Sequence, residues 1–225
     1  MELILIEGLP GSGKSTLAES LCNTALNNGI KSNWYLEEAK DHPVHPIDFR
    51  SEKNKTSFPE HCLQQWQKFI FDNKNNDQLF ILEGSLFQST VRFMMESNNQ
   101  ALVSEYFKSC QEILSMIKTT FIYLRPPETM SHIDWVITHR TDQWANKVSE
   151  YLQATPYCLE RNLQGLSGMA VFWSDYALLC DSLIIESRIE SYTINAGVGY
   201  FETQTDEAIR YSGIENSFNL NQAQS

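Results

Sequence analysis

The sequence predicts an α/β fold in which a five-stranded parallel sheet lies between two layers of helices. Short apolar runs alternate with longer segments of helical periodicity along most of the chain. Parallel strands need a long crossover, usually a helix, so this alternation is typical of a parallel sheet. With 42% hydrophobic residues among 225, the chain has enough apolar surface to fold as one domain. We expect that domain over residues 1–213, followed by a polar tail at 214–225.

The expected strands are short apolar or aromatic runs bounded by polar residues, glycine or proline. Each run is shorter than a typical helix and suits a strand that is buried in a parallel sheet. They are residues 3–7, 32–36, 79–82, 120–124 and 183–185.

The expected helices are longer segments with apolar residues at helical spacing. The segment that begins at Ser57 has Pro59 in its first turn, where proline is favoured. The helices are expected at 14–28, 57–76, 86–97, 101–118, 127–139, in a stretch that ends at 152, and at 156–180.

Charge and cysteine content exclude several classes of protein. A formal charge of −11 makes a nucleic acid polymer an unfavourable partner, because like charges repel. The five cysteines include no CxxC pair and fit neither a disulfide framework nor a zinc site, which favours a cytoplasmic protein. The N-terminal apolar run at 3–6 is too short for a signal peptide. We also expect no membrane span, since no stretch approaches about 20 apolar residues.

A glycine-rich loop between the first strand and the first helix is the strongest functional signal. Residues Gly8 to Ser15 fit the pattern G-x-x-x-x-G-K-[ST] at every position, with an apolar strand before and a helix after. Glycines let successive N–H groups point at phosphate oxygens, Lys14 supplies a positive charge, and the Ser15 hydroxyl is suited to bind Mg²⁺. The motif therefore predicts a P-loop that binds ATP or GTP. The candidate nucleotide-binding residues are Gly8, Leu9, Pro10, Gly11, Ser12, Gly13, Lys14, Ser15, Thr16 and Arg125.

Acidic residues follow two further strands. Since the carboxyl ends of parallel strands meet at one edge of the sheet, these acids are expected near the P-loop. Glu83 follows four apolar residues, at the position where P-loop proteins place a carboxylate for the metal, so Ser15 and Glu83 are the candidate Mg²⁺ ligands. Either Glu37 or Glu38 is a candidate general base that takes the proton of an attacking hydroxyl.

Motifs of other P-loop classes are absent from the sequence. No D-x-x-G follows a strand, and residues 73–77 miss the guanine-reading N-K-x-D by one residue. A GTPase is therefore less favoured than an ATP-dependent enzyme.

The loop sequence G-L-P-G-S-G-K-S-T resembles the loops of nucleotide kinases and polynucleotide-kinase-type enzymes. The wider layout resembles deoxynucleoside kinases, whose third strand ends in E-R-S and whose fourth reads I-Y-L-R-x-x-P-E. Residues 122–128 match the second pattern apart from a shortened spacing, and Glu83-Gly84-Ser85 matches the first except at Gly84. The resemblance covers residues 1–190 and implies a P-loop three-layer α/β/α fold and phosphoryl transfer.

The same resemblance implies an arginine-bearing lid helix after the fourth strand. Arg140 is the candidate, because an arginine is most effective where charge develops on the transferring phosphoryl group. Arg125 is expected either to position the nucleotide or to pair with a strand-end acid, and Arg92 to face the acceptor or solvent. An acceptor pocket for a planar ring is expected from the residues around the loop after the second strand, which are Trp34, Tyr35, His42, His45 and Phe49.

These observations favour an ATP- and Mg²⁺-dependent kinase that acts on a small hydroxyl-bearing acceptor, with a nucleoside or nucleotide slightly preferred. The alternatives are a nucleotide-dependent switch or regulatory ATPase, a nucleotide-binding module without catalysis, and a sugar or antibiotic phosphotransferase. By analogy with the fold, the helices at 86–118 are candidates for a homodimer interface.

Overall fold

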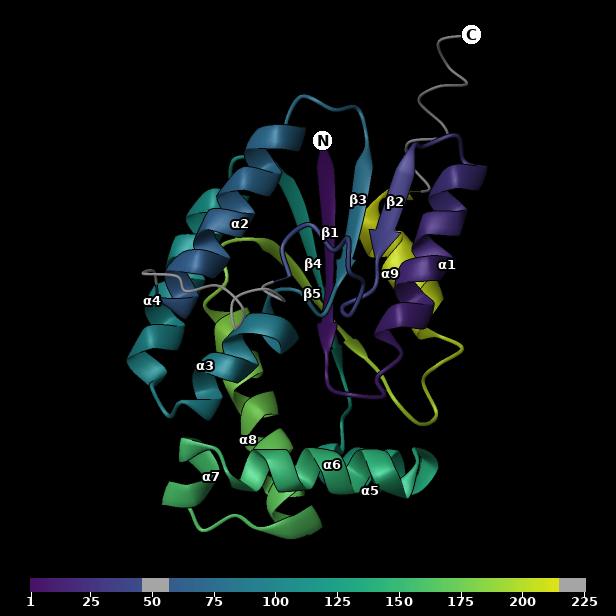
Figure 1. The fold of residues 1–225 in the computed structure, drawn as a ribbon. Helices are drawn as coiled ribbons and strands as arrows, with labels where there is room; N and C mark the ends of the chain where they lie inside the picture. The colour runs from purple at the N-terminus through teal and green to yellow at the C-terminus, as the bar shows by residue number, and fades with distance from the viewer. Residues whose placement is uncertain (46–56, 215–225) are drawn as a thin grey trace, which may run out of the picture.

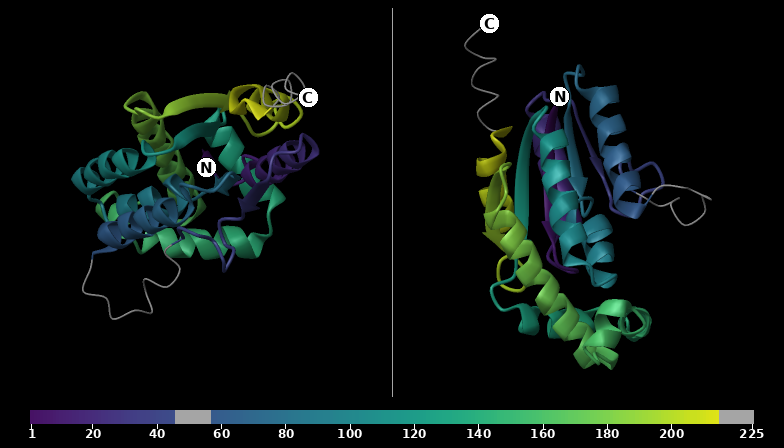
Figure 2. Two further views of the ribbon diagram at one scale, coloured as in Figure 1. Left: turned by 90° about the horizontal axis from the view of Figure 1, so that it is seen from above. Right: turned by 90° about the vertical axis from the view of Figure 1, so that its left-hand side faces the viewer.

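The computed structural model describes residues 1–45 and 57–214 and contains the expected parallel sheet (Figure 1). The strand order is β2-β3-β1-β4-β5, and each neighbouring pair is parallel. Helices cover both faces of the sheet (Figure 2), so the predicted three-layer α/β fold is confirmed. The strands are β1 (Glu2–Gly8), β2 (Ser32–Tyr35), β3 (Leu79–Glu83), β4 (Lys118–Arg125) and β5 (Glu190–Asn195).

The helices fall into three groups. Helices α1 and α9 cover one face of the sheet, and α2, α4 and α8 cover the other. Helices α5 and α6 lie beyond the carboxyl ends of the strands (Figure 1). The bounds are α1 (Lys14–Asn27), α2 (Phe58–Asn73), a π-helical turn η2 (Phe87–Val91), α3 (Arg92–Glu96), α4 (Gln100–Leu114), α5 (Thr129–His139), α6 (Asp142–Gln153), α7 (Pro156–Glu160), α8 (Gly165–Ile185) and α9 (Gln204–Ser212).

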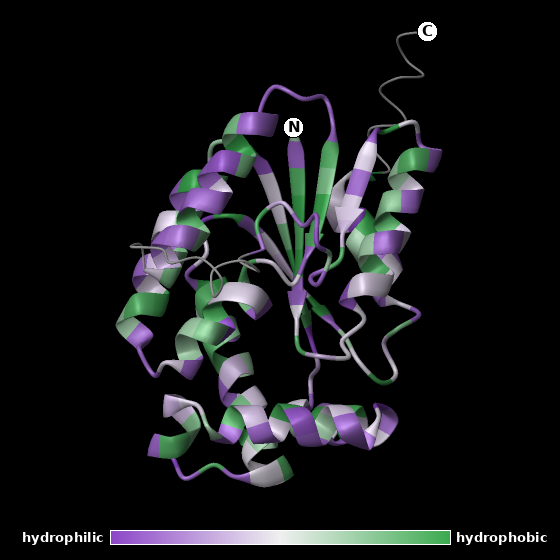
Figure 3. Cartoon of the chain, viewed as in Figure 1, coloured by the Kyte–Doolittle hydropathy of each residue, from purple (hydrophilic) through white to green (hydrophobic). Residues whose placement is uncertain are grey.

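Strand β1 separates two hydrophobic cores. Successive side chains of a strand point to opposite faces, so Leu3 and Leu5 join the core under α2, α4 and α8, while Ile4 and Ile6 join the core under α1 and α9. All four side chains are buried. The apolar centre of the sheet is visible in Figure 3, between helices that contain both hydrophilic and hydrophobic residues.

Helix α2 begins where the sequence predicts. Ser57 caps it, and the Ser57 N–H donates to Glu60 Oε2 at 2.9 Å, in a capping box with proline in the first turn. The Trp66 side chain then faces the core and its Nε1 donates to the hydroxyl of Tyr106 on α4 at 3.3 Å. This bond ties α2 to α4 on the same face of the sheet.

We expected no segment that is both apolar enough and long enough to span a membrane, and helix α8 is an exception to this expectation. By length and composition its 21 residues pass that test, with a mean hydropathy of 1.3 over the most apolar window. Half of that window is buried inside the protein, and Phe172, Tyr176 and Cys180 pack in the core against the sheet. A helix of this kind is also found in the core of soluble proteins, so its composition is accounted for by packing.

Two sequence predictions in the last third of the chain were wrong. Residues 183–185 form the last turn of α8 and no strand, and the fifth strand is instead Glu190–Asn195. This strand lies at the edge of the sheet and is mostly half buried or exposed, so it lacks a continuous apolar run. The expected helix at 156–180 is divided into α7 and α8, because Asn162 and Gly165 have φ of 54° and 60°.

Other boundaries also differ from the predictions. The helix expected at 86–97 consists of the π-helical turn η2 followed by α3, and the helix expected at 101–118 ends at Leu114. Helix α9 was not expected. The predicted polar tail lies outside the described residues, apart from Ile214.

The central strand should be sensitive to loss of apolar volume. Leu5→Ala is expected to lower the free energy of unfolding by about 2–5 kcal/mol, because the residue is fully buried and the deletion leaves a cavity. Leu178→Ala is the matched control, since Leu178 is 61% exposed, and should change it by less than about 1 kcal/mol. Urea unfolding followed by circular dichroism measures both. Equal losses would contradict this description of the core.

Candidate active site

The loop of residues 9–13 joins β1 to α1 at the carboxyl edge of the sheet. Gly13 precedes α1 with a φ of 94°, a conformation that glycine adopts most readily, and a Cβ there would lie 2.5 Å from Gln204 Nε2. Helix α1 can therefore begin at Lys14 with its N–H groups and the positive end of its dipole directed into the loop. Such a helix terminus attracts anions.

Lys14 is buried in this loop. Its Nζ donates to the carbonyl oxygens of Gly8 at 3.2 Å and Leu9 at 3.1 Å. Of the other predicted loop residues, Ser12 has a buried hydroxyl without a hydrogen-bond partner among the described residues, and Thr16 is exposed in the first turn of α1.

Ser15 and Glu83 lie together, as expected for two metal ligands. The Ser15 hydroxyl donates to Glu83 Oε1 at 3.1 Å, and the backbone N–H of Glu37 donates to the same oxygen at 3.0 Å. Glu83 is almost completely buried at the end of β3. One carboxylate thus connects the P-loop helix with the end of β2.

The Glu37 carboxylate is held by two donors from η2. Gln88 Nε2 donates to Oε2 at 2.6 Å, and the Ser89 hydroxyl donates to Oε1 at 3.1 Å. Burial raises the pKa of Glu37 above its usual value of 4.5, and the nearby charge of Glu83 raises it further, whereas Lys14 acts in the opposite direction. Glu38 is exposed and makes no side-chain hydrogen bond within the described ranges. Of the two candidate bases, the structure therefore brings Glu37 into the site.

Gly84, the departure from the E-R-S pattern, has a structural reason. Its φ is 67°, and a Cβ at this position would lie 3.0 Å from Glu37 Oε2. A side chain would thus meet the carboxylate of the candidate base. Glycine permits Glu37 to lie directly against the end of β3.

Glu7 was missed by the sequence analysis. It is fully buried near the end of β1, and its carboxylate accepts hydrogen bonds from the N–H groups of Leu86 at 2.5 Å and Gln88 at 3.2 Å. Burial raises its pKa to about 8, and the backbone hydrogen bonds and Lys14 oppose this shift. The signal available in the sequence is one acid within an apolar run, next to the loop.

Arg125 is engaged away from the P-loop. Its Nε donates to both carboxylate oxygens of Asp181, at 2.8 and 3.1 Å, and its Nη2 donates to Oδ2 at 3.0 Å. The predicted alternatives were a nucleotide or a strand-end acid, whereas Asp181 belongs to α8. This ion pair connects the end of β4 with α8.

The other two candidate arginines also have partners. Arg140 is exposed at the end of α5, with its guanidinium 4.6 Å from the ring centroid of Trp144. Arg92 forms an ion pair with Glu96, and its Nε donates to the carbonyl oxygen of Gln88 at 3.0 Å.

The predicted aromatic pocket is divided by the structure. Trp34 packs with the core under α1 and α9, whereas Tyr35, His42 and His45 form edge-to-face contacts at 6.1 and 5.8 Å between ring centroids. Phe49 lies outside the described residues. In the part of the chain that the structure describes, the ring surface at the end of β2 is therefore formed by one tyrosine and two histidines.

Helix α5 contacts the P-loop directly. His132 Nε2 lies 2.9 Å from the carbonyl oxygen of Pro10, and because that oxygen only accepts, Nε2 carries the proton. Val136 approaches Gly11, where an added Cβ would lie 2.6 Å from its Cγ2. Helix α5 and the loop thus form one packed unit, which the sequence did not indicate.

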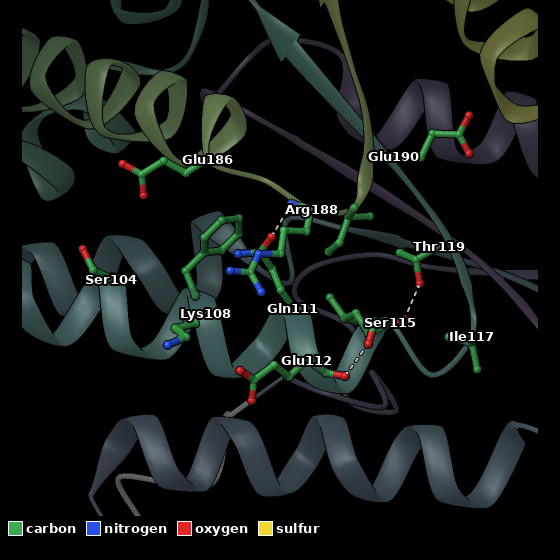
Figure 4. Close-up of a pocket in the computed structure, with 13 residues that line it drawn as sticks. Ser104, Lys108, Gln111, Glu112, Ser115, Ile117, Thr119, Glu186, Arg188 and Glu190 are labelled. Carbon is green, nitrogen blue, oxygen red and sulfur yellow. Dashed lines mark hydrogen bonds between the residues drawn. The ribbon is translucent and has the colours of Figure 1, made fainter.

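A cavity of about 680 Å³ lies elsewhere, between α4 and the segment that joins α8 to β5 (Figure 4). It contains none of the predicted site residues, and its lining includes Thr119 and Glu190 at the amino ends of β4 and β5. Gln111 in its wall accepts a hydrogen bond from the Arg188 N–H at 2.6 Å. The candidate active site is at the opposite edge of the sheet.

Solved structures resemble this arrangement. A sugar kinase from a Janibacter species has a TM-score of 0.50 and 12% identity, over 97% of this chain and 98% of that one. The chain has a P-loop kinase-like fold. Weaker likenesses are a deoxyadenosine kinase from M. mycoides with bound dATP (15% identity, TM-score 0.46, coverage 92% and 97%) and a gluconokinase from Sinorhizobium meliloti (12%, 0.41, 99% and 96%). No protein-family model and no curated protein sequence matches this sequence. This similarity to solved structures concerns the fold alone, so the reaction must be inferred from the residues of the site.

His42 makes the stability of this site dependent on pH. Its Nδ1 accepts a hydrogen bond from the Val44 N–H at 3.3 Å. Burial lowers its pKa from 6.5 to about 4; His45 lowers it further and Asp41 opposes this. Between these pH values the unfolded chain binds a proton that the folded chain does not. The free energy of unfolding therefore falls as pH drops from 6.5 towards 4.

Replacing His42 should remove part of that pH dependence. Between pH 6.5 and pH 4 the free energy of unfolding of the wild type is expected to fall by about 1–3 kcal/mol more than that of His42→Gln. Urea unfolding at the two pH values measures this difference. His139→Gln, at an exposed position, is the control and should behave as the wild type. Identical pH profiles for wild type and His42→Gln would exclude His42 as the titrating group.

Proposed function

We propose that this protein is an ATP- and Mg²⁺-dependent kinase that transfers a phosphoryl group to a hydroxyl of a small molecule. The main support is that Glu83 Oε1 accepts hydrogen bonds both from the P-loop hydroxyl of Ser15 and from the backbone N–H of Glu37, which brings the half-buried residue Glu37 beside the candidate metal ligands. Nucleotide binding alone would require only the loop, whereas a half-buried acid next to the candidate metal ligands suits proton transfer.

The residues of the loop fit a nucleotide and a metal. The N–H groups at the start of α1, Lys14 and the unpartnered hydroxyl of Ser12 would hold the phosphates. Ser15 and Glu83 would hold Mg²⁺, because their oxygens are adjacent and oxygen ligands are those that Mg²⁺ prefers. The metal would supply neutralisation of charge on the transferring phosphoryl group.

Glu37 would be the general base. Its raised pKa makes it a stronger proton acceptor than an exposed glutamate, and its two donors from η2 fix the direction of the carboxylate. The acceptor hydroxyl would donate its proton to Glu37 as its oxygen bonds to the terminal phosphorus, and the bond between that phosphorus and the bridging oxygen of ADP would break, so that ADP leaves.

Arg140 remains the candidate for stabilising the transferring phosphoryl group. It follows His132 and Val136 at intervals of four residues, and both of these residues contact the P-loop. Residues four apart lie on the same face of a helix, so Arg140 is one turn beyond the contacts with the loop.

The acceptor would be a small hydroxyl-bearing molecule, with a nucleoside or nucleotide slightly favoured by the resemblance in the sequence. Gln88 Oε1 and His45 Nδ1 are buried without a hydrogen-bond partner in the described residues, and both belong to segments beside Glu37 and Glu38. These atoms suit polar groups of such a molecule. We also propose a cytoplasmic location, because the five cysteines are buried thiols without disulfide bonds.

An assay of ADP release with Mg²⁺ and ATP tests the proposed function. Nucleosides, nucleotides, sugars and aminoglycosides are offered as acceptors. The wild type is expected to release ADP only when one of these acceptors is present. Lys14→Ala and Glu83→Gln should each reduce kcat/KM by a factor of about 10² or more, since each removes a charge that acts on the phosphates or the metal.

Two other outcomes would contradict a kinase. ADP release that is independent of every acceptor would indicate a switch or a regulatory ATPase. Nucleotide binding without any ADP release would indicate a module that only binds nucleotide.

Loss of the base should have a distinct pH signature. Glu37→Gln is expected to lower kcat by about 10²–10⁴ and leave the dissociation constant of Mg²⁺-ATP nearly unchanged. In the wild type, kcat should rise with pH through the raised pKa of Glu37, because only the carboxylate accepts the proton. Steady-state kinetics across pH, with Glu38→Gln in parallel, measure this. A larger loss in Glu38→Gln would assign the base to Glu38.

A further inference from the structure

Glu7 is an acid in a place where sequence and structure favour apolar residues. It follows Leu5 and Ile6 in the central strand and is fully buried. A carboxylate without partners is very unfavourable in such surroundings, so its partners show what the acid contributes.

The partners of Glu7 belong to the turn that begins η2. Its two carboxylate oxygens accept hydrogen bonds from the N–H groups of Leu86 and Gln88, and it forms no ion pair within the described residues. N–H groups at the start of a helical turn lack acceptors of their own, so a carboxylate is well suited to hold them. Glu7 therefore fixes the start of η2 to the end of β1, one residue before the P-loop.

The turn held by Glu7 also holds the candidate base. Gln88 donates to Glu7 through its backbone N–H and to Glu37 through its side chain, and the next residue, Ser89, donates to the other oxygen of Glu37. A continuous series of hydrogen bonds thus leads from Glu7 through Gln88 to Glu37.

We propose that Glu7 is a positioning residue, which directs the Glu37 carboxylate through Gln88 and Ser89. This proposal rests on the proposed kinase function, since it assigns the orientation of the proposed base to a residue that does not touch the substrate.

The titration of Glu7 offers a way to observe this connection. Burial raises its pKa to about 8, and the groups that face it are Lys14 on α1 and the side chains of Tyr176 and Cys180 on α8. When Glu7 changes charge, the hydrogen bonds from Leu86 and Gln88 should change in strength, because bonds to a carboxylate are stronger than bonds to a carboxylic acid.

The experiment compares the wild type, Glu7→Gln and the matched control Glu2→Gln, since Glu2 is an exposed acid at the start of the same strand. The glutamine side chain has one acceptor oxygen, whereas the carboxylate of Glu7 provides one oxygen for the N–H group of Leu86 and another for that of Gln88. Nitrogen–proton NMR spectra on either side of pH 8 follow the backbone amides of residues 86 and 88 and the side-chain amide of Gln88. Steady-state kinetics give kcat and the KM for ATP, and circular dichroism checks that each variant folds.

In the wild type, all three signals should shift with one midpoint, and Glu7→Gln should abolish the shift. Glu7→Gln should also lower kcat on the order of 10- to 100-fold while the KM for ATP changes less than about twofold, because misplacing a reacting group affects the chemical step. Ser89→Ala should also lower kcat. In the double variant Glu7→Gln/Ser89→Ala, the increase in activation free energy should be smaller than the sum of the increases in the two single variants, because residues of one hydrogen-bonded series do not act independently.

Other outcomes would overturn the proposal. If the Gln88 side-chain signals are the same in Glu7→Gln and wild type, Glu7 does not position this turn. If kcat is unchanged, or if the effects of Glu7 and Ser89 are additive, Glu7 does not act through Ser89. A wild type without acceptor-dependent turnover would instead contradict the proposed function, whereas normal turnover in Glu7→Gln contradicts only the role of Glu7.

Discussion

Strand β1 lies between β3 and β4 and pairs with both along most of its length. In this register Ile6 is opposite Glu83 on one side, and Gly8 is opposite Leu124 on the other. Backbone hydrogen bonds of the sheet, and not contacts between side chains, therefore set the P-loop beside the acid that ends β3. The apolar residues that alternate along β1 then hold the helices that supply the remaining site residues.

At this edge the carboxylates of Glu7 and Glu37 both interact with the ammonium group of Lys14, and the charge of Glu83 acts on Glu37. Like charges in a poorly solvated place repel each other, so neighbouring carboxylates raise the free energy of the folded state unless other groups stabilise them. The structure reduces this cost with N–H and hydroxyl donors from η2, from α1 and from the end of β2. Arg92 and Arg125 form ion pairs with Glu96 and Asp181, so the carboxylates of the site are stabilised mainly by these hydrogen bonds and by Lys14.

The sequence was sufficient where one local rule determined the structure. The P-loop and the three central strands β1, β3 and β4 were predicted, because burial on both faces leaves a continuous apolar run, and the edge strand β2 was predicted from its aromatic residues. The edge strand β5 was missed, since an edge strand needs no such run, and residues 183–185 were apolar only because they end a core helix. The pairing of Arg125 with Asp181 and the role of Glu7 depend on segments far apart in the chain, and no spacing in the sequence reveals them.

The contact between Gly84 and Glu37 also restricts the paths by which this site can evolve. An arginine at position 84 would put its Cβ 3.0 Å from the Glu37 carboxylate and would need an unusual backbone conformation. Such a substitution requires the Glu37 carboxylate to shift, and the strain of the left-handed backbone remains in addition. The two positions are therefore expected to be epistatic, because the effect of a side chain at position 84 depends on where the Glu37 carboxylate lies.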